Sequence, residues 1–231
     1  MKKARAAAAL LCVLITMLSF GCGKKPNPTD TTDPALPVPT SETVTSDEKT
    51  VKNSVEEMTR LDAAKNNQIL VSDGEELERA LKDKQSAGVL FRTEERLSLT
   101  LSGKHDGKTI TVKAPASSIV SESENVSFIL MSVGTGGLIT DAKAKSIYVS
   151  GENVPLTLKA GAENVIIKGA KCSVTFKGGE YGSVTVFNTT TVLTNLSSEP
   201  IVITCANGTA FSLPSMQTYY FENDSFEKAK P

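Results

Sequence analysis

The sequence contains no tryptophan, one histidine and four cysteines, and aromatic residues make up 5% of its 231 residues. So few histidines and cysteines argue against a zinc-rich or disulfide-rich scaffold. Neither sign of charge dominates, because 25 Lys and Arg face 26 Asp and Glu, and we therefore expect no nucleic-acid partner. The only long apolar run lies at the N-terminus, which excludes a polytopic membrane protein. The rest of the composition is that of a globular chain.

Residues that carry catalytic chemistry are also scarce. The sequence has no arginine after Arg96, and Asp141 is the only aspartate between Asp106 and Asn223. It has no Gly-x-Ser-x-Gly motif, phosphate-binding Gly loop or metal-spaced His/Cys set. The single histidine, His105, precedes Asp106 in a Gly-rich turn, which favours a solvated loop over an acid–base pair. We therefore expect no catalytic residue, no metal site, no cofactor and no enzymatic activity.

The N-terminus has the pattern of an export signal. Three cations within the first five residues precede an apolar stretch at residues 6–20, which is too short for a comfortable transmembrane helix. The stretch ends in Ser19-Phe20-Gly21-Cys22, which resembles a bacterial lipoprotein signal. That resemblance implies removal of residues 1–21 and lipid attachment at Cys22, so the protein would be exported and anchored to the bacterial membrane, facing outside the cytoplasm. Secretion without lipid, or retention of an uncleaved anchor, remains an alternative.

A spacer is expected between the anchor and the folded body. Residues 22–46 hold five of the ten prolines together with many Thr, Ser and Asp residues, a composition that favours an extended tether. Residues 47–66 follow with one apolar stripe at helical spacing, formed by Val51, Val55, Met58 and Leu61. This pattern predicts an amphipathic helix.

The body, residues 67–231, begins with a short helix. Ser72 or Asp73 is a suitable N-cap, acidic residues follow in the first turn, and Leu77, Ala80 and Leu81 make an apolar face. We expect this helix near residues 73–84, between short strands. The order of elements over residues 69–115 resembles the start of pectate-lyase-like right-handed β-helices. In that family such a helix covers the N-terminal end of the coil, and the resemblance implies the same capping role here.

The remaining sequence repeats with a fixed period of about 18 residues. Two interleaved sets of short strands share this period, one including residues 146–150 and 164–168, the other 156–159 and 174–177. A fixed period near twenty indicates a solenoid. We therefore predict a mainly β, right-handed, single-stranded parallel β-helix, with an antiparallel β-sandwich as the alternative. The aromatic-rich residues 211–226 are expected to form a C-terminal cap.

Three glutamates give the sequence its one candidate site. Glu163, Glu180 and Glu199 all come just before strands of the same set, and equivalent positions stack in a coil. They predict a short acidic ladder, which is either a solvated edge compensated by nearby lysines or a weak site for a cation or a basic ligand. The period places Cys172 and Cys205 in the inward phase, as buried residues rather than a disulfide pair.

The functional expectation is a lipid-anchored, non-catalytic binding or structural module at the bacterial cell surface. Its partners would be the membrane, reached through the lipid, and a cell-wall or extracellular glycan or a protein ligand. One alternative is a carbohydrate-active β-helix enzyme of the polysaccharide lyase or hydrolase type. Another is a self-assembling envelope scaffold, because the period also resembles that of the filament-forming bactofilins.

Overall fold

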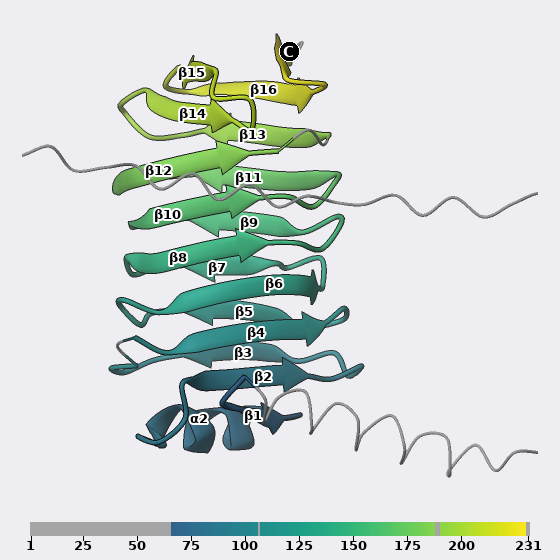
Figure 1. Ribbon diagram of the computed structural model, residues 1–231, viewed down its shortest axis with the longest axis vertical. Helices are drawn as coiled ribbons and strands as arrows, with labels where there is room; N and C mark the ends of the chain where they lie inside the picture. Colours follow the sequence, from purple (N-terminus) through teal and green to yellow (C-terminus); the bar gives the residue numbers. More distant parts are fainter. Residues whose placement is uncertain (1–65, 106, 188–189, 230–231) are drawn as a thin grey trace, which may run out of the picture. The chain divides into compact units, whose positions relative to one another are not determined.

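The computed structural model describes residues 66–105, 107–187 and 190–229. The predicted signal peptide, tether, lipid-attachment residue Cys22 and nearly all of the predicted amphipathic helix therefore lie outside the described residues. The described chain winds into a parallel β-solenoid of about seven turns with two β-sheets (Figure 1).

Each complete turn of the solenoid contributes one strand to each sheet. Sheet A contains β1 (Gln68–Val71), β2 (Gly88–Arg92), β4 (Thr109–Ala114), β6 (Ser127–Val133), β8 (Ala144–Val149), β10 (Gly161–Ile167), β12 (Glu180–Val186), β14 (Ile201–Cys205) and β15 (Ala210–Leu213). Sheet B contains β3 (Ser98–Leu101), β5 (Ser118–Ser121), β7 (Leu138–Thr140), β9 (Pro155–Leu158), β11 (Cys172–Phe176), β13 (Thr191–Asn195), β16 (Gln217–Glu222) and β17 (Ser225–Lys228).

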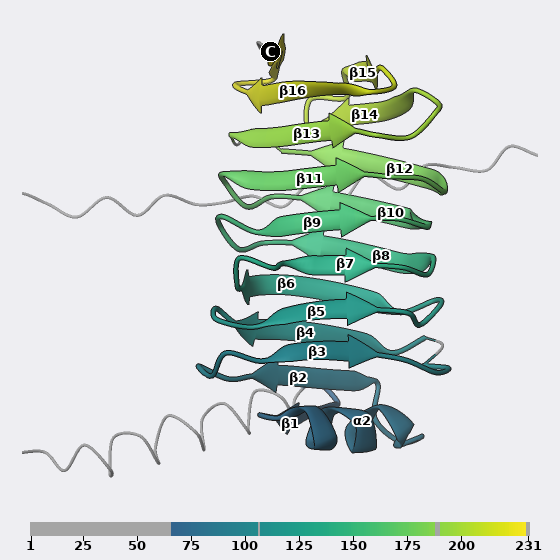
Figure 2. The ribbon, with the colours of Figure 1, turned by 180° about the vertical axis from the view of Figure 1, so that it is seen from behind.

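The strands from β1 to β14 pair in parallel within their sheets, which rules out the antiparallel sandwich. From β2 to β14 the sheet A strands run to the right in Figure 1, and from β3 to β13 the sheet B strands run to the right in the reversed view of Figure 2, while the chain climbs. The coil is therefore right-handed, as predicted.

The repeat is slightly longer than the sequence suggested, with a spacing of roughly 19 residues between coils. In the middle of the stack the register pairs Ser127 with Ser146 and Ser146 with Asn164. The first steps are longer, since Gln68 pairs with Gly88 and Gly88 with Thr109. The predicted period thus holds in the middle of the stack and lengthens at its N-terminal end.

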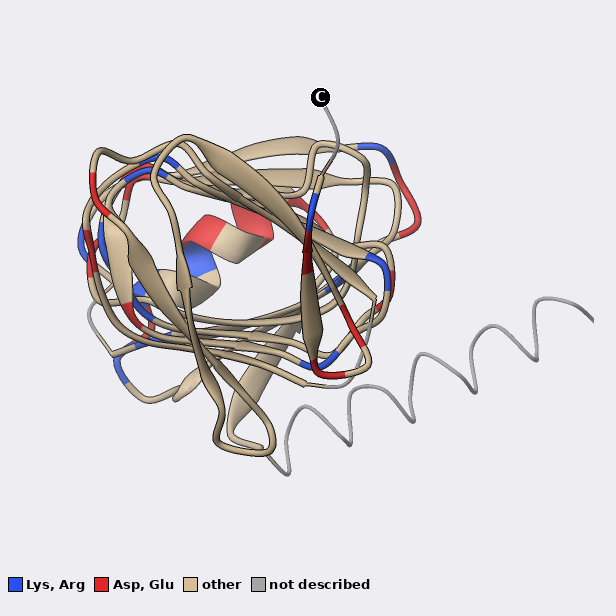
Figure 3. Ribbon diagram, turned by 90° about the horizontal axis from the view of Figure 1, so that it is seen from above, with Lys and Arg blue, Asp and Glu red and all other residues tan. Residues whose placement is uncertain are grey.

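Strict alternation of side chains builds the core. In β11 the burial pattern places Val174 and Phe176 inside the coil and Thr175 between them on the outer face. Strands β9, β13 and β14 show the same alternation, whereas β2 is buried at four consecutive residues. The inward residues of all coils join in one continuous core cluster. A single coil cannot hide its own inner face, and stacking on its neighbours stabilises it. Viewed along the axis, charged positions gather mainly at the corners of the coil (Figure 3).

Glycine allows the corners of neighbouring coils to approach closely. A Cβ atom on Gly169 would lie 1.7 Å from the carbonyl oxygen of Gly151, one coil away. A Cβ atom on Gly151 would in turn lie 2.0 Å from the carbonyl oxygen of Met131. No side chain fits in these gaps, so glycine at both positions is required by the stacking of the corners.

A helix precedes the first complete coil. It is α2 (Gly74–Lys82), and the Asp73 side chain caps it by accepting a hydrogen bond from the Glu76 backbone N–H at 2.8 Å. The Glu76 carboxylate accepts one from the Ser72 N–H in return, at 3.0 Å. Its three predicted apolar residues, Leu77, Ala80 and Leu81, are buried in the core cluster. The helix predicted near residues 73–84 is present; that it serves as a cap stays a prediction.

At the other end the chain reverses direction. Strand β15 pairs antiparallel with β14, and β16 pairs antiparallel with β13 and with β17. Phe211 and Phe226 stack with ring centroids 4.1 Å apart, and Phe226 also contacts Phe221 at 4.8 Å. The aromatic residues of the segment predicted as the C-terminal cap thus pack together on the last coil.

Candidate functional site

The three glutamates expected to form a ladder do not share one register. The Cα partner of Glu180 is Gly161, and Gly182 is the residue packed on the Glu163 backbone in the next coil. Glu163 therefore lies two residues away from the position that would stack on Glu180. Glu199 lies in the loop before β14 and is exposed. Among the described residues, no group of three or more His, Cys, Asp or Glu side chains converges on a point that suits a metal ion.

The structure corrects the interpretation of His105. Its side chain is only 7% exposed, although the sequence favoured a solvated turn. The Nε2 atom lies 3.1 Å from the Ser102 carbonyl oxygen, and Nδ1 is buried without a hydrogen-bond partner. The ring is therefore shielded from solvent and lies against the Ser102 backbone of its own turn.

The two cysteines of the body lie inside the coil, as predicted. Cys172 and Cys205 are both buried and free. The Cys172 thiol lies 3.3 Å from the Gly169 carbonyl oxygen, and burial raises its pKa. Burial also raises the pKa of Cys205, with a smaller contribution from the negative charge of Asp224. Both thiols therefore stay protonated at neutral pH and are poor nucleophiles.

The outer face of sheet A carries an apolar column that the sequence did not reveal. The register places Ile129 of β6, Tyr148 of β8 and Ile166 of β10 directly beside one another, and each is partly exposed. The ammonium group of Lys168 lies 5.7 Å from the Tyr148 ring centroid and 4.6 Å from that of Phe187. These five residues, named here the sheet A patch, combine aromatic surface with an exposed cation.

A polar column runs beside the sheet A patch. It consists, in register, of Ser127, Ser146, Asn164 and Ser183. The Ser183 hydroxyl donates to the Asn164 side-chain oxygen at 2.8 Å. Adjacent strands lie about 4.8 Å apart, so the face presents hydrogen-bonding groups at a fixed repeat beside an apolar strip. The signal that would have located this face is the alignment of outward residues across coils, which requires the register of each strand.

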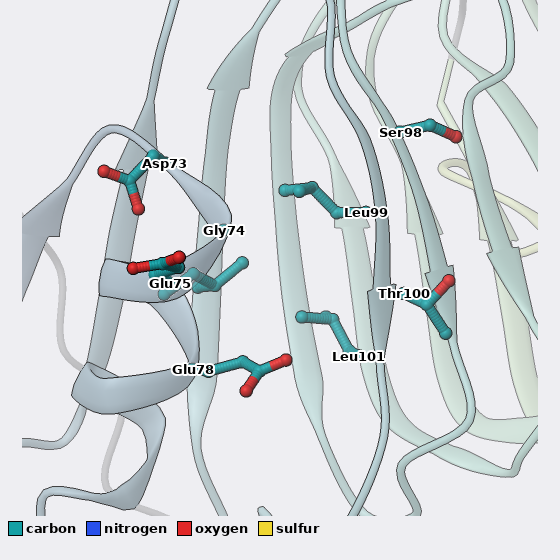
Figure 4. Close-up of a pocket in the computed structure, with 9 residues that line it drawn as sticks. Asp73, Gly74, Glu75, Glu78, Ser98, Leu99, Thr100 and Leu101 are labelled. Atoms are coloured by element: carbon teal, nitrogen blue, oxygen red, sulfur yellow. The ribbon is translucent and has the colours of Figure 1, made fainter.

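A groove lies at the N-terminal end of the stack, between α2 and β3. Its volume is about 530 Å³. It is lined by Asp73, Gly74, Glu75, Leu77, Glu78, Ser98, Leu99, Thr100 and Leu101 (Figure 4). Figure 4 shows the Leu99 and Leu101 side chains pointing toward the helix and the Ser98 and Thr100 side chains pointing away from it.

Comparison of the chain with family models, curated proteins and solved structures finds no match. None of the helices in the described part of the chain has the length and apolar character needed to cross a membrane. The fold of the described chain is a parallel β-solenoid, and the evidence that bears on function is the chemistry of its surfaces.

Proposed function

We propose that the protein is a lipid-anchored, extracytoplasmic binding module of the bacterial envelope, and that the sheet A patch binds a polysaccharide chain. The observation that carries this proposal is the alignment of Tyr148, Lys168 and Phe187 beside the polar Ser/Asn column. A flat ligand with alternating apolar and hydroxyl-bearing surfaces is complementary to such a face.

The chemistry of the patch favours sugars. Aromatic rings offer apolar faces on which the C–H side of a sugar ring packs, and the Ser and Asn side chains donate and accept hydrogen bonds. Lys113 on β4 and Lys168 are exposed on the same side of sheet A and provide positive charge for carboxylated or phosphorylated sugars. An acidic polysaccharide is therefore the preferred ligand. The rigidity of the stacked coils keeps these groups aligned without an ordering cost on binding.

The anchoring part of the proposal rests on the sequence of residues 1–22. A basic start, an apolar stretch and a small residue before Cys22 support export and lipid attachment. The resemblance of residues 69–115 to pectate-lyase-like β-helices also belongs to the proposal, as a relationship of fold.

A binding screen with matched tyrosine variants tests the function. The full-length protein, purified in detergent, is titrated with acidic and neutral cell-wall polysaccharides. Replacing Tyr148 by Ala is expected to weaken binding roughly three- to tenfold, because the free energy of one aromatic contact corresponds to a change in affinity of that size. The control is Tyr220→Ala, which removes a tyrosine that is 48% exposed on β16 of sheet B and should change nothing.

Two outcomes decide against the proposal. If no polysaccharide binds, or if Tyr148→Ala and Tyr220→Ala bind alike, the sheet A patch is not the ligand site. The same incubations are analysed for shortened chains, because cleavage would favour the carbohydrate-active alternative over a non-catalytic module.

A further inference from the structure

The two sheets do not begin at the same level. Sheet A starts with β1 and β2, and the chain between these two strands forms α2 where each later coil has a sheet B strand. Sheet B therefore begins one coil later, with β3 as its first strand. No described strand pairs with β3 on the side facing away from β5.

The unpaired edge of β3 offers backbone hydrogen-bonding groups. The Leu97 and Leu101 carbonyls accept from the Ser118 and Glu122 N–H groups at 2.9 and 2.8 Å, so these residues face the next coil. Backbone groups alternate in direction along a parallel ladder, and those of Ser98 and Thr100 consequently face the opposite way. Both residues are exposed. An open strand edge of this kind is a template for pairing with another chain.

The groove beside this edge lies between α2 and β3. Leu99 and Leu101 form its inner wall, and Gly74 at the start of α2 keeps it open, because a Cβ atom there would lie 3.0 Å from the Leu99 side chain. An added strand would lie about 4.8 Å from β3. Its inward side chains would then face the first turns of α2.

The negative charge of the groove favours a basic ligand. Asp73, Glu75 and Glu78 line it, and all three are exposed. Among the described residues, none of these three carboxylates forms an ion pair with a Lys or Arg side chain. Lys or Arg side chains on an added strand would complement them.

A second copy of this protein does not fit the groove by its C-terminal end. Around the hairpin of β16 and β17 the exposed residues that the structure describes include Glu222, Glu227 and Lys228. End-to-end stacking would thus bring acidic groups against the acidic groove. Like charges at such a contact are unfavourable.

We propose that β3 and α2 form a docking site for an extended, Lys- or Arg-containing segment of another protein, which adds to sheet B as a strand next to β3. Main-chain hydrogen bonds to Ser98 and Thr100 supply the affinity common to strand addition, and the carboxylates of α2 supply the preference for basic residues. This site is separate from the sheet A patch and does not depend on the binding of polysaccharide.

The probe is a short fluorescent peptide in which Lys alternates with Thr and Val, titrated into the full-length protein in detergent. The same peptide with Glu in place of Lys is the ligand control. We expect the Lys peptide to bind and the Glu peptide not to bind. Combined Glu75→Gln and Glu78→Gln substitutions should weaken binding by about tenfold. A matched double variant, Glu152→Gln with Glu227→Gln, removes equal charge at exposed positions elsewhere and should bind as the unmodified protein does.

Two further variants distinguish strand addition from simple charge attraction. Thr100→Pro removes an N–H group that faces the groove, and edge strands accept proline there. Gly74→Leu fills the groove without changing its charge. Each should abolish binding while the circular dichroism spectrum is retained. Slower hydrogen exchange at the Ser98 and Thr100 amides on peptide binding would support the same conclusion.

Equal binding by all variants, or loss of binding only with the charge variants, would overturn strand addition at β3. A concentration-dependent dimer that the peptide dissociates would assign the groove to a second copy instead and would also overturn the proposal.

Discussion

Replacing Phe176 by Ala tests whether the interior of the coil holds the solenoid together. Phe176 lies at the end of β11, with Leu158 of β9 and Asn195 of β13 as its Cα partners in the neighbouring coils. Its side chain is 0% exposed. The ring packs edge-on against Tyr181, with the ring centroids 5.1 Å apart and an interplanar angle of 85°. The substitution therefore leaves a cavity shared by three coils and removes an aromatic pair.

The expected loss of unfolding free energy is large. Buried Phe-to-Ala changes cost about 3–5 kcal/mol, and the lost aromatic contact places this one in the upper part of that range. For a body of this size the corresponding fall in Tm is roughly 10–20 °C. Urea unfolding followed by far-ultraviolet circular dichroism measures the loss.

The control for this prediction is the preceding residue. Thr175 lies on the outer face of the same strand and is partly exposed. Thr175→Ala should change the free energy of unfolding by about 0.5 kcal/mol or less. If both variants are destabilised alike, or if Phe176→Ala costs less than about 1 kcal/mol, the assignment of inward and outward faces is refuted.

Two other predictions concern Tyr181 and the N-terminal anchor. Burial raises the pKa of Tyr181 well above its usual value near 10, although the hydroxyl also donates to the Gly178 carbonyl oxygen at 2.8 Å. Because the Tyr181 hydroxyl then ionises at lower pH in the unfolded chain than in the folded protein, the protein should lose stability as the pH rises above about 10. In urea titrations, the free energy of unfolding of Tyr181→Phe should depend less on pH between about pH 10 and 12. An identical slope for both proteins would contradict the burial of the hydroxyl. At the N-terminus, Cys22→Ser should abolish incorporation of labelled palmitate and release the protein from membranes, whereas the matched Cys12→Ser should do neither. Labelled Cys22→Ser protein would disprove the assigned attachment residue.

The solenoid was predictable because its signal is local and repeated. Alternation such as Leu156 and Leu158 against Thr157 assigns each strand an inner face, and the recurrence of such strands at a nearly constant spacing leaves few arrangements other than a stack. The short helix was predictable for the same reason, since its cap at Asp73 and its apolar face lie within a few residues.

The predicted stacking of Glu163 on Glu180 was wrong because it depended on register. Counting from the strands placed Glu163 and Glu180 at similar positions, but the aligned pair is Asn164 with Ser183, so that Glu163 precedes it by one residue and Glu180 by three. Strand β12 begins at Glu180, earlier than its hydrophobic pattern suggests. Charged and polar residues before a strand carry no local signal that would fix this offset.

The candidate binding surfaces were missed for a related reason. The contact of Lys168 with Tyr148 and Phe187 joins three coils, and the groove depends on where α2 lies beside the edge of β3. His105 likewise gave a misleading pattern, because its glycine-rich turn suggested exposure whereas the ring is buried and lies against the Ser102 carbonyl. These features arise from tertiary packing and are absent from any single stretch of sequence.

Because the chain reverses direction in β15 and β16, an additional coil could be inserted only in the middle of the stack. Both ends of the stack have specialised structures, the helix α2 at one and the antiparallel strands at the other. The coils between them repeat one interchangeable unit. Duplicating a coil between β8 and β10, for example, would extend the rod by about 4.8 Å and lengthen the sheet A patch by one row, while each end kept its own neighbours. The length of the stack and the length of the sheet A patch would therefore change together, in single-coil increments.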